Sequence, residues 1–309
     1  MSISGSHLAV QRHVEYIQSL DTQQDDLEYW LTEHLRLNGL YWGLTALHIL
    51  GHPEALSREE TIDFVFSCQR ENGGFGAAPG HDAHVLYTVS AVQILVEIDA
   101  LEELDRRTNE GRGKVARYLA NLQDKQTGTF AGDEWGEVDT RFLYAAINAL
   151  SLLDCLSMID QQKAVEYLQA CTNFDGGYGA SPGAESHSAQ IFTCVAALAI
   201  LGKLDLVDTE RLGCWLSERQ LPNGGLNGRP EKLEDVCYSW WVLSPLAVIG
   251  KLDWIDREKQ LAYILSCQDT EKGGLADRPN DMVDVFHTHF AIAGLSLLSY
   301  PGLEPIDPV

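Results

Sequence analysis

The stretch "YLQACTNFDGGYGASPG" at residues 167–183 decides the fold, because similar stretches recur along the chain. In each copy an apolar segment passes a Gln or Thr, and the chain then turns at glycine. The five copies occupy residues 64–80, 118–132, 167–183, 215–230 and 263–279. One glycine at a matching place in each turn marks the repeat, and we call these five residues the glycine ruler: Gly74, Gly128, Gly177, Gly225 and Gly274. They are separated by 54, 49, 48 and 49 residues. This period indicates a protein built of repeats.

A second apolar segment follows each turn, as in "SAQIFTCVAALAILG" at residues 188–202, and a further one, "GLYWGLTALHILG", lies at 39–51. Apolar residues recur every three or four positions and strand alternation is scarce, so both segments of each unit are predicted helices. We therefore predict an all-α chain of about six helical hairpins. Such hairpins stack as an open solenoid or close into an α/α toroid, and the period alone leaves both possible. The wider first spacing predicts an inserted surface loop at 97–113.

Composition narrows the class of protein. A chain of 309 residues with 45% hydrophobic residues and a net charge of −23 is typical of a globular protein and argues against general nucleic-acid binding. We expect one domain spanning 1–309. No apolar run reaches the roughly 18 residues of a membrane span, and the first 20 residues lack the layout of a signal peptide. Seven cysteines without paired spacings indicate reduced thiols, so we expect a cytoplasmic protein.

Ionisable residues stand at one level of the repeats. Ten or eleven residues after the ruler glycine, the chain carries His84, Asp139, His187, Asp235 and Asp284. Helix capping explains any one of the aspartates, but histidine is expected to be a poor cap. A ring of titratable groups lining a common site explains all five positions better. That interpretation favours closure of the repeats into a toroid.

The segment "EKLEDVCYSWW" at residues 231–241 carries a candidate metal site. Asp235 and Cys237 are two residues apart, so they share a metal only at a helix start, where the backbone is not yet regular. His287, three residues after Asp284, is the candidate third ligand. Asp, Cys and His form a plausible zinc set that leaves a fourth position open. A buried apolar cysteine beside tryptophans is the competing interpretation.

Basic residues are unusually placed in this acidic chain. Arg229 and Lys232 precede the candidate ligands, Tyr238 follows them, and His187 stands at the matching level one repeat earlier. Together they would make a clamp for a phosphate or diphosphate. The competing interpretation is a pair of surface charges that offset neighbouring glutamates. Aromatic residues near the starts of the second helices are candidates to wall an apolar tunnel: Tyr41, Trp42, Tyr87, Tyr144, Phe192, Trp240 and Trp241.

The whole chain resembles the β subunits of protein prenyltransferases, most of all the Rab geranylgeranyltransferase type. The most specific segments are "GDEWGEVDTRF", "NFDGGYGASPGAESHSAQI", "GGLNGRPEKLEDVCYSWW", "WIDREK" and "ADRPNDMVDVFHTHFAIAGLSLL". The resemblance implies an α/α barrel, as also found in terpene cyclases, with one zinc. The matching positions, by implied role, are Asp235, Cys237 and His287 for zinc; His187, Arg229, Lys232 and Tyr238 for diphosphate; Trp241 for isoprenoid; Asp277 for magnesium; and Arg141 and Asp284 for the acceptor peptide or support of the ligands.

The resemblance also implies an activity and partners. The activity is transfer of a geranylgeranyl group from geranylgeranyl diphosphate to C-terminal cysteines of Rab GTPases. The expected partners are a prenyltransferase α subunit and a Rab escort protein. A farnesyl or CaaX-type geranylgeranyl transferase remains an alternative. A terpene cyclase is disfavoured by the lack of DxDD and DDxxD clusters. A non-catalytic helical scaffold is the alternative outside enzymes.

Overall fold

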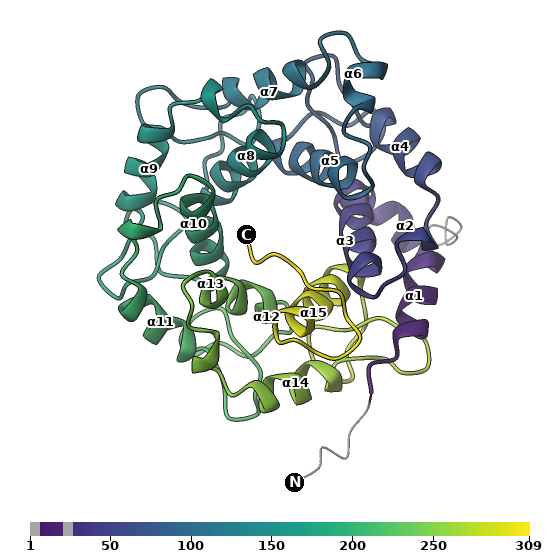
Figure 1. Ribbon diagram of the computed structural model, residues 1–309, viewed down its shortest axis with the longest axis vertical. Helices are drawn as coiled ribbons and strands as arrows, with labels where there is room; N and C mark the ends of the chain where they lie inside the picture. Colours follow the sequence, from purple (N-terminus) through teal and green to yellow (C-terminus); the bar gives the residue numbers. More distant parts are fainter. Residues whose placement is uncertain (1–6, 21–26) are drawn as a thin grey trace.

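The computed structural model describes residues 7–20 and 27–309, which form a closed ring of helices (Figure 1). Part of the N-terminal segment considered for a signal peptide, residues 1–6, lies outside the described residues. The prediction of an α/α toroid is confirmed, and the open solenoid is excluded. The chain alternates between an outer and an inner helix as it passes round the ring. No helix among the described residues combines the length and apolar character of a membrane span.

The helices fall into two concentric layers. The inner layer consists of α3 (Arg36–Ile49), α5 (Val85–Glu97), α8 (Thr140–Leu152), α10 (Ser188–Ile200), α12 (Tyr238–Trp241), α13 (Leu243–Val248) and α15 (Val285–Leu297). The outer layer consists of α1 (Val10–Ser19), α4 (Arg58–Ser67), α7 (Gly111–Asn121), α9 (Gln161–Ala170), α11 (Thr209–Ser217) and α14 (Arg257–Ser266). Inner helices are apolar nearly all round because they pack between the outer layer and the interior of the ring.

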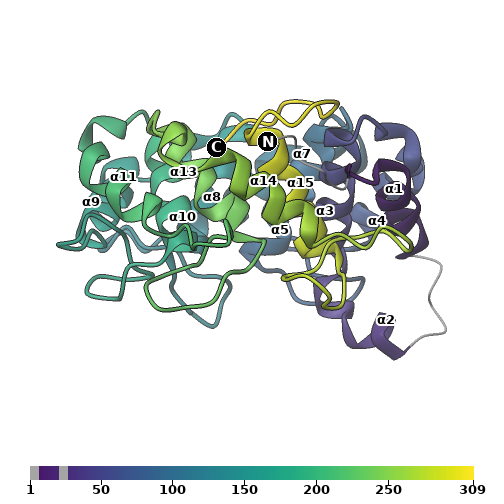
Figure 2. The same ribbon diagram turned by 90° about the horizontal axis from the view of Figure 1, so that it is seen from below.

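Shorter elements connect the two layers. A short helix, α2 (Leu27–Leu31), and a single 3₁₀ turn, η2 (Glu33–Leu35), lead from α1 into α3. Other 3₁₀ turns join inner helices to the next outer ones, at η3 (Pro53–Ala55), η4 (Leu156–Met158), η5 (Leu204–Leu206) and η6 (Leu252–Trp254). The turns that lead from outer to inner helices gather at one end of the ring (Figure 2).

The glutamine of the repeat motif ties three of the units to the next outer helix. The side chain of Gln123 accepts from the N–H of Asp160 at 2.8 Å and donates to its carbonyl at 2.9 Å, and Gln220 does the same for Asp256 at 2.8 and 3.0 Å. In the last repeat, Gln268 accepts from the N–H of Ala9 at 3.0 Å. Its amide nitrogen donates to the carbonyl of His7 at 3.3 Å. The first and last repeats are therefore joined by a similar contact, and α15 packs against α3 to complete the inner layer.

The glycines of these turns have a steric cause. Gly224 adopts a φ of +95°, and a Cβ there would lie 2.3 Å from the carbonyl oxygen of Lys259 on the next outer helix. Only glycine satisfies both the left-handed backbone and this close approach. The matching glycine in each of the other turns likewise packs against the next outer helix, which explains why glycine recurs once in each repeat.

Two expectations about secondary structure need correction. The fifth inner segment is two short helices, α12 and α13, because Pro245 lacks an N–H and its ring clashes with the carbonyl four residues earlier. The insertion at 97–113 contains a short helix, α6 (Glu103–Arg107), as well as loop. Its arginines bind nearby carboxylates, with Arg107 Nη1 lying 2.6 Å from Asp63 of α4.

Candidate functional site

Four of the five ionisable positions at the helix starts act as helix caps. Asp139 and Asp284 accept hydrogen bonds from backbone N–H groups in the first turns of α8 and α15. His84 and His187 do the same for α5 and α10, each through Nδ1 at 3.1 Å. The expectation that histidine caps poorly is therefore wrong for this chain. Asp235 differs, because it accepts from the N–H of Cys237, the residue that precedes α12, and α12 has no side-chain cap. All five side chains still bind the backbone close to a helix start, at one end of the ring.

Three of the predicted side chains converge at this end. Asp235, Cys237 and His287 each offer one ligand atom, and these atoms lie within 4.8 Å of one another. The first two residues stand where α12 begins, and the N–H of Cys237 reaches Oδ1 of Asp235 at 2.8 Å. The third lies in the first turn of α15, which packs against α12. The break in the fifth inner segment comes after these ligands and leaves this helix start in place.

A fourth residue orients the histidine of this cluster. Nδ1 of His287 lies 2.5 Å from Oδ2 of Asp284, while Nε2 lies 3.4 Å from Oδ1 of Asp235. One ring nitrogen is therefore held by a carboxylate, and the other points at the remaining ligand atoms. Carboxylates commonly hold metal-binding histidines in this way.

The electrostatics of the cluster suit a divalent cation. Burial lowers the pKa of His287, but hydrogen bonds and charges from Asp235 and Asp284 outweigh it and raise the pKa to about 10. Burial, followed by the charge of Asp235, raises the pKa of the Cys237 thiol well above its usual range. A cation bound here would take the place of the protons on His287 and Cys237, which the carboxylates of Asp235 and Asp284 favour. One sulfur, one imidazole nitrogen and one carboxylate oxygen are donors that zinc prefers.

Predicted anion-binding residues lie next to this cluster. The ring of His187 contacts Tyr238 edge-on, with Nε2 3.5 Å from the phenol oxygen. His187 and Arg229 both line a pocket of about 240 Å³. Burial and then the charge of Arg229 lower the pKa of His187. Lys232 is exposed on the loop that also carries Arg229.

The partner of Arg229 was missed from the sequence. Glu185 forms an ion pair with Arg229 and lines the same pocket, where Gln190 also lies. Glu185 stands two residues before His187, but nothing in the sequence shows that it faces an arginine 44 residues further on. The guanidinium is thus held at the pocket by a carboxylate.

Two further predicted residues are already paired. Arg141 binds Asp139, the cap of α8, through two hydrogen bonds of 3.0 Å. The carboxylate of Asp277 binds Arg278 at 2.9 Å, while its backbone carbonyl accepts from the N–H of Val236 at 2.8 Å. Asp277 therefore lies beside the ligand segment through its backbone, with its carboxylate directed to a neighbouring arginine.

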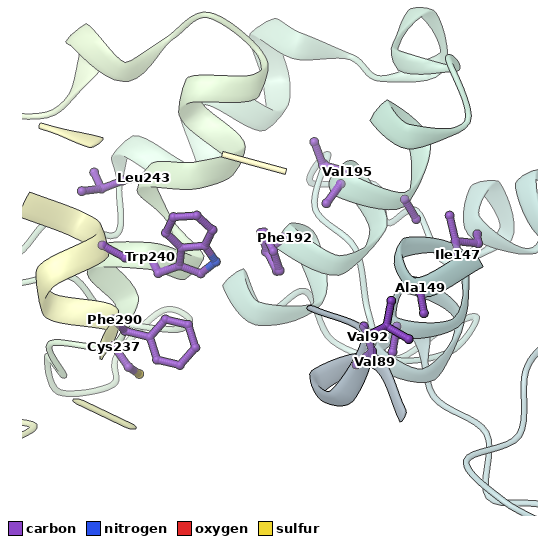
Figure 3. Packing of buried hydrophobic residues seen from close by; sticks show 14 of the residues in the cluster. Val89, Val92, Ile147, Ala149, Phe192, Val195, Cys237, Trp240, Leu243 and Phe290 are labelled. Carbon is purple, nitrogen blue, oxygen red and sulfur yellow. The ribbon is translucent and has the colours of Figure 1, made fainter. Parts of the chain in front are cut away.

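Aromatic rings continue from the ligand cluster into the ring of helices. The ring of Trp241 lies 4.4 Å from Phe290 and 5.2 Å from Phe192, measured between centroids. Figure 3 shows Trp240 and Phe290 directed to the same interior region as Phe192, with Cys237 beside Phe290. Phe290 was not predicted, although its place three residues after His287 puts it on the same side of α15. The structure thus joins polar and aromatic groups at one mouth of the ring.

A closed helical ring with a three-ligand cluster at one mouth defines an α/α-toroid protein with a candidate metal centre. Residues 8–309 match the model of the prenyltransferase alpha-alpha toroid domain, and the chain belongs to that family. The resemblance predicted from the motifs is confirmed.

Relatives and solved structures agree with this assignment. The chain is 55% identical to the geranylgeranyl transferase type-2 subunit beta of Saccharomyces cerevisiae, over 99% of this chain and 95% of that protein. It is 54% identical to geranylgeranyl transferase type-2 subunit beta 1 of Arabidopsis thaliana, over 97% and 92%. The structure of Candida albicans protein geranylgeranyltransferase-I complexed with GGPP matches with a TM-score of 0.85 at 22% identity, covering 98% of this chain and 95% of that one. At this identity the structural match supports the fold alone.

Proposed function

We propose that the chain is the catalytic β subunit of a Rab geranylgeranyltransferase. It would transfer a geranylgeranyl group from geranylgeranyl diphosphate to cysteine thiols at the C termini of Rab GTPases. The observation that carries the proposal is the convergence of Asp235, Cys237 and His287 beside the pocket that His187 and Arg229 line. The relatives named type-2 subunit beta support this type over the farnesyl and CaaX types.

The ligand cluster would hold one zinc ion. When bound, zinc supplies a positive charge at which a coordinating thiol loses its proton. Asp284 would keep His287 in the orientation that presents Nε2 to the metal. With Asp235, Cys237 and His287 as ligands, a zinc ion would have one position left for the substrate cysteine.

The basic residues would bind the diphosphate. A bond forms between the substrate sulfur and C1 of the isoprenoid, and the bond from C1 to the diphosphate oxygen breaks. His187, Arg229, Lys232 and Tyr238 would stabilise the charge that develops on the departing diphosphate, so catalysis rests on positioning and electrostatics. Asp277 is the candidate to bind magnesium at the same diphosphate, which requires its carboxylate to leave Arg278.

The aromatic interior would receive the isoprenoid chain. Trp241 lies with Phe192 and Phe290 at the mouth that leads inward from the ligands. Burial of the chain is worth roughly 0.8 kcal/mol per CH₂ group. Arg141, held by Asp139, would face the acceptor peptide. The protein would act in the cytoplasm, as a heterodimer with a prenyltransferase α subunit and with an escort protein that presents the Rab substrate.

The proposal is tested by transfer assays on the chain co-expressed with its α subunit. Geranylgeranyl diphosphate and farnesyl diphosphate are each offered with a Rab protein and escort protein, and with a CaaX-terminated protein. We expect geranylgeranyl transfer to the Rab protein alone. Transfer only to the CaaX protein would assign the chain to another prenyltransferase type, and no transfer by the folded heterodimer would favour the scaffold alternative.

A further inference from the structure

One repeat differs from the other four at a matched pair of positions. In every repeat, a backbone N–H just after the glycine turn donates to a carbonyl at the end of the outer helix. The pairs, donor first, are Gly76 with Cys68, Ala131 with Leu122, Gly179 with Cys171, Asn227 with Arg219, and Ala276 with Cys267, at 2.9 to 3.1 Å. Four pairs combine a glycine or alanine with a cysteine or leucine. In the remaining pair both residues are polar, and this pair belongs to the repeat that carries Arg229 and Lys232.

The two exceptional side chains contact each other while buried. Arg219 is 4% exposed and Asn227 is 2% exposed. The guanidinium donates through Nε to the carbonyl of Trp215 at 3.1 Å, lies 4.4 Å from the centroid of that indole ring, and reaches Oδ1 of Asn227 through Nη1 at 3.5 Å. Burial of a guanidinium is unfavourable unless its hydrogen bonds are satisfied. Trp215, Asn227 and Glu218, whose Oε2 lies 3.8 Å from Nη2, supply its partners, and the four counterparts need none of them.

The amide of Asn227 connects this pair to the loop at residues 228–233. Nδ2 of Asn227 donates to the backbone carbonyl of Lys232 at 2.8 Å. The other end of the loop is fixed by Gly228, whose carbonyl accepts from the N–H of Ser188 at 2.9 Å. Within the loop, Glu231 adopts a φ of +63°, a left-handed conformation that is unfavourable for a residue with a side chain. Inside the loop, the N–H of Lys232 supports this turn, at 3.4 Å from the carbonyl of Arg229, and the bond from Asn227 adds a second restraint.

We propose that Arg219 and Asn227 are positioning residues for the anion-binding loop. Arg219 fixes the amide of Asn227, and Asn227 holds the backbone of Lys232, so the loop presents Arg229 and Lys232 before the ligand arrives. The inference rests on the proposed function, because it assumes that this loop binds the diphosphate. Preorganisation of a loop raises affinity by reducing the ordering required on binding.

The other repeats supply matched substitutions for a test. Asn227→Ala introduces the residue found at Ala131 and Ala276, and Arg219→Leu introduces the residue found at Leu122. In the heterodimer, we expect each to weaken binding of geranylgeranyl diphosphate about 3- to 10-fold, the loss typical of one hydrogen bond. Binding of geranylgeraniol, which lacks the diphosphate, and zinc content should stay at wild-type values. The control is Arg211→Leu, which removes an exposed arginine of the same repeat.

A double-mutant cycle separates positioning from general stability. If Asn227 positions Lys232 together with Arg229, adding Asn227→Ala to Lys232→Ala weakens diphosphate binding by less than Asn227→Ala does in the wild type. Fully additive losses, or an equal loss of geranylgeraniol binding, would overturn the inference. If Asn227→Ala fails to fold, Asn227→Gly, the residue at Gly76 and Gly179, takes its place. Wild-type protein that binds no geranylgeranyl diphosphate would contradict the proposed function itself, whereas unchanged binding by these variants would contradict only the inference.

Discussion

Oδ2 of Asp284 lies 2.5 Å from Nδ1 of His287, so the residue that caps α15 also orients a candidate metal ligand. We expect Asp284→Ala to reduce zinc affinity about 10- to 100-fold, because the ring loses the partner that directs Nε2 toward the metal. Competition with a chelator measures this change. Asp160→Ala is the control, since Asp160 caps α9 far from the ligands and should cost only about 1 kcal/mol of stability. Equal zinc affinity in both variants would show that Asp284 is only a cap.

Arg229→Ala tests the anion pocket. We expect kcat/KM for geranylgeranyl diphosphate to fall roughly 10- to 100-fold, because a charged hydrogen bond to the diphosphate is lost. Steady-state kinetics at fixed Rab concentration measures it. Arg12→Ala, which removes an exposed arginine paired with Glu15, should leave the kinetics unchanged. Kinetics of Arg229→Ala that match the wild type would remove this residue from the diphosphate site.

Glu97 predicts a pH dependence of stability. Burial raises its pKa from 4.5 to about 7, although Thr45 donates a hydrogen bond to the carboxylate. The folded state therefore holds this proton more tightly than the unfolded state does. The resulting stability is fully present below pH 4.5 and is lost as the pH rises through 7.

Glu97→Gln keeps the acceptor for Thr45 and removes the ionisation. Relative to the wild type, we expect this variant to gain stability at pH 8 on the order of 2 to 3 kcal/mol and much less at pH 5. Melting temperatures at both pH values measure the difference. The other ionisable residues of the pocket that Glu97 lines are His48, Glu304 and Asp307. They are present in both the wild type and Glu97→Gln, so their titration does not account for a difference between the two. An equal effect at both pH values would show that Glu97 does not titrate in this range.

Gly224→Ala tests why the turn needs glycine at the position before the ruler residue Gly225. A methyl group there would meet the carbonyl oxygen of Lys259 at 2.3 Å, in addition to the unfavourable φ. Gly250→Ala is the matched control, because Gly250 has a φ of +70° but no heavy atom within 4 Å of the added Cβ. The control should lose about 1 kcal/mol of stability and Gly224→Ala at least about 1 to 2 kcal/mol more. Equal losses in denaturant unfolding would mean that backbone conformation alone selects glycine.

Much of this molecule follows from patterns that are local in sequence. The glycine ruler predicts the repeats because neighbouring hairpins must approach to the same distance all round the ring. The ruler also places Asp235 at a helix start, and that placement makes its pairing with Cys237 geometrically possible. Pro245 indicates a helix break, but the continuous apolar character of the segment around it favours the prediction of one helix.

Other features depend on which repeats become neighbours. The contact of Gln268 with Ala9 closes the ring, and it joins residues 259 positions apart. The ion pair between Glu185 and Arg229 likewise spans two repeats. The capping role of His187 was missed for a different reason, because general preferences rank histidine below aspartate as a cap. His187 caps α10 and also lines the pocket, so a residue type that is uncommon as a cap stands at this helix start.

Zinc content tests the central claim most directly. The chain is purified with its α subunit as wild type, as Cys237→Ser and as Cys214→Ser, the last removing an exposed cysteine of α11 as a control. We expect about one zinc per β chain in the wild type and in Cys214→Ser, and a marked loss in Cys237→Ser. Folded wild-type protein that takes up no zinc after supplementation, or a Cys237→Ser variant that retains it fully, would contradict the account.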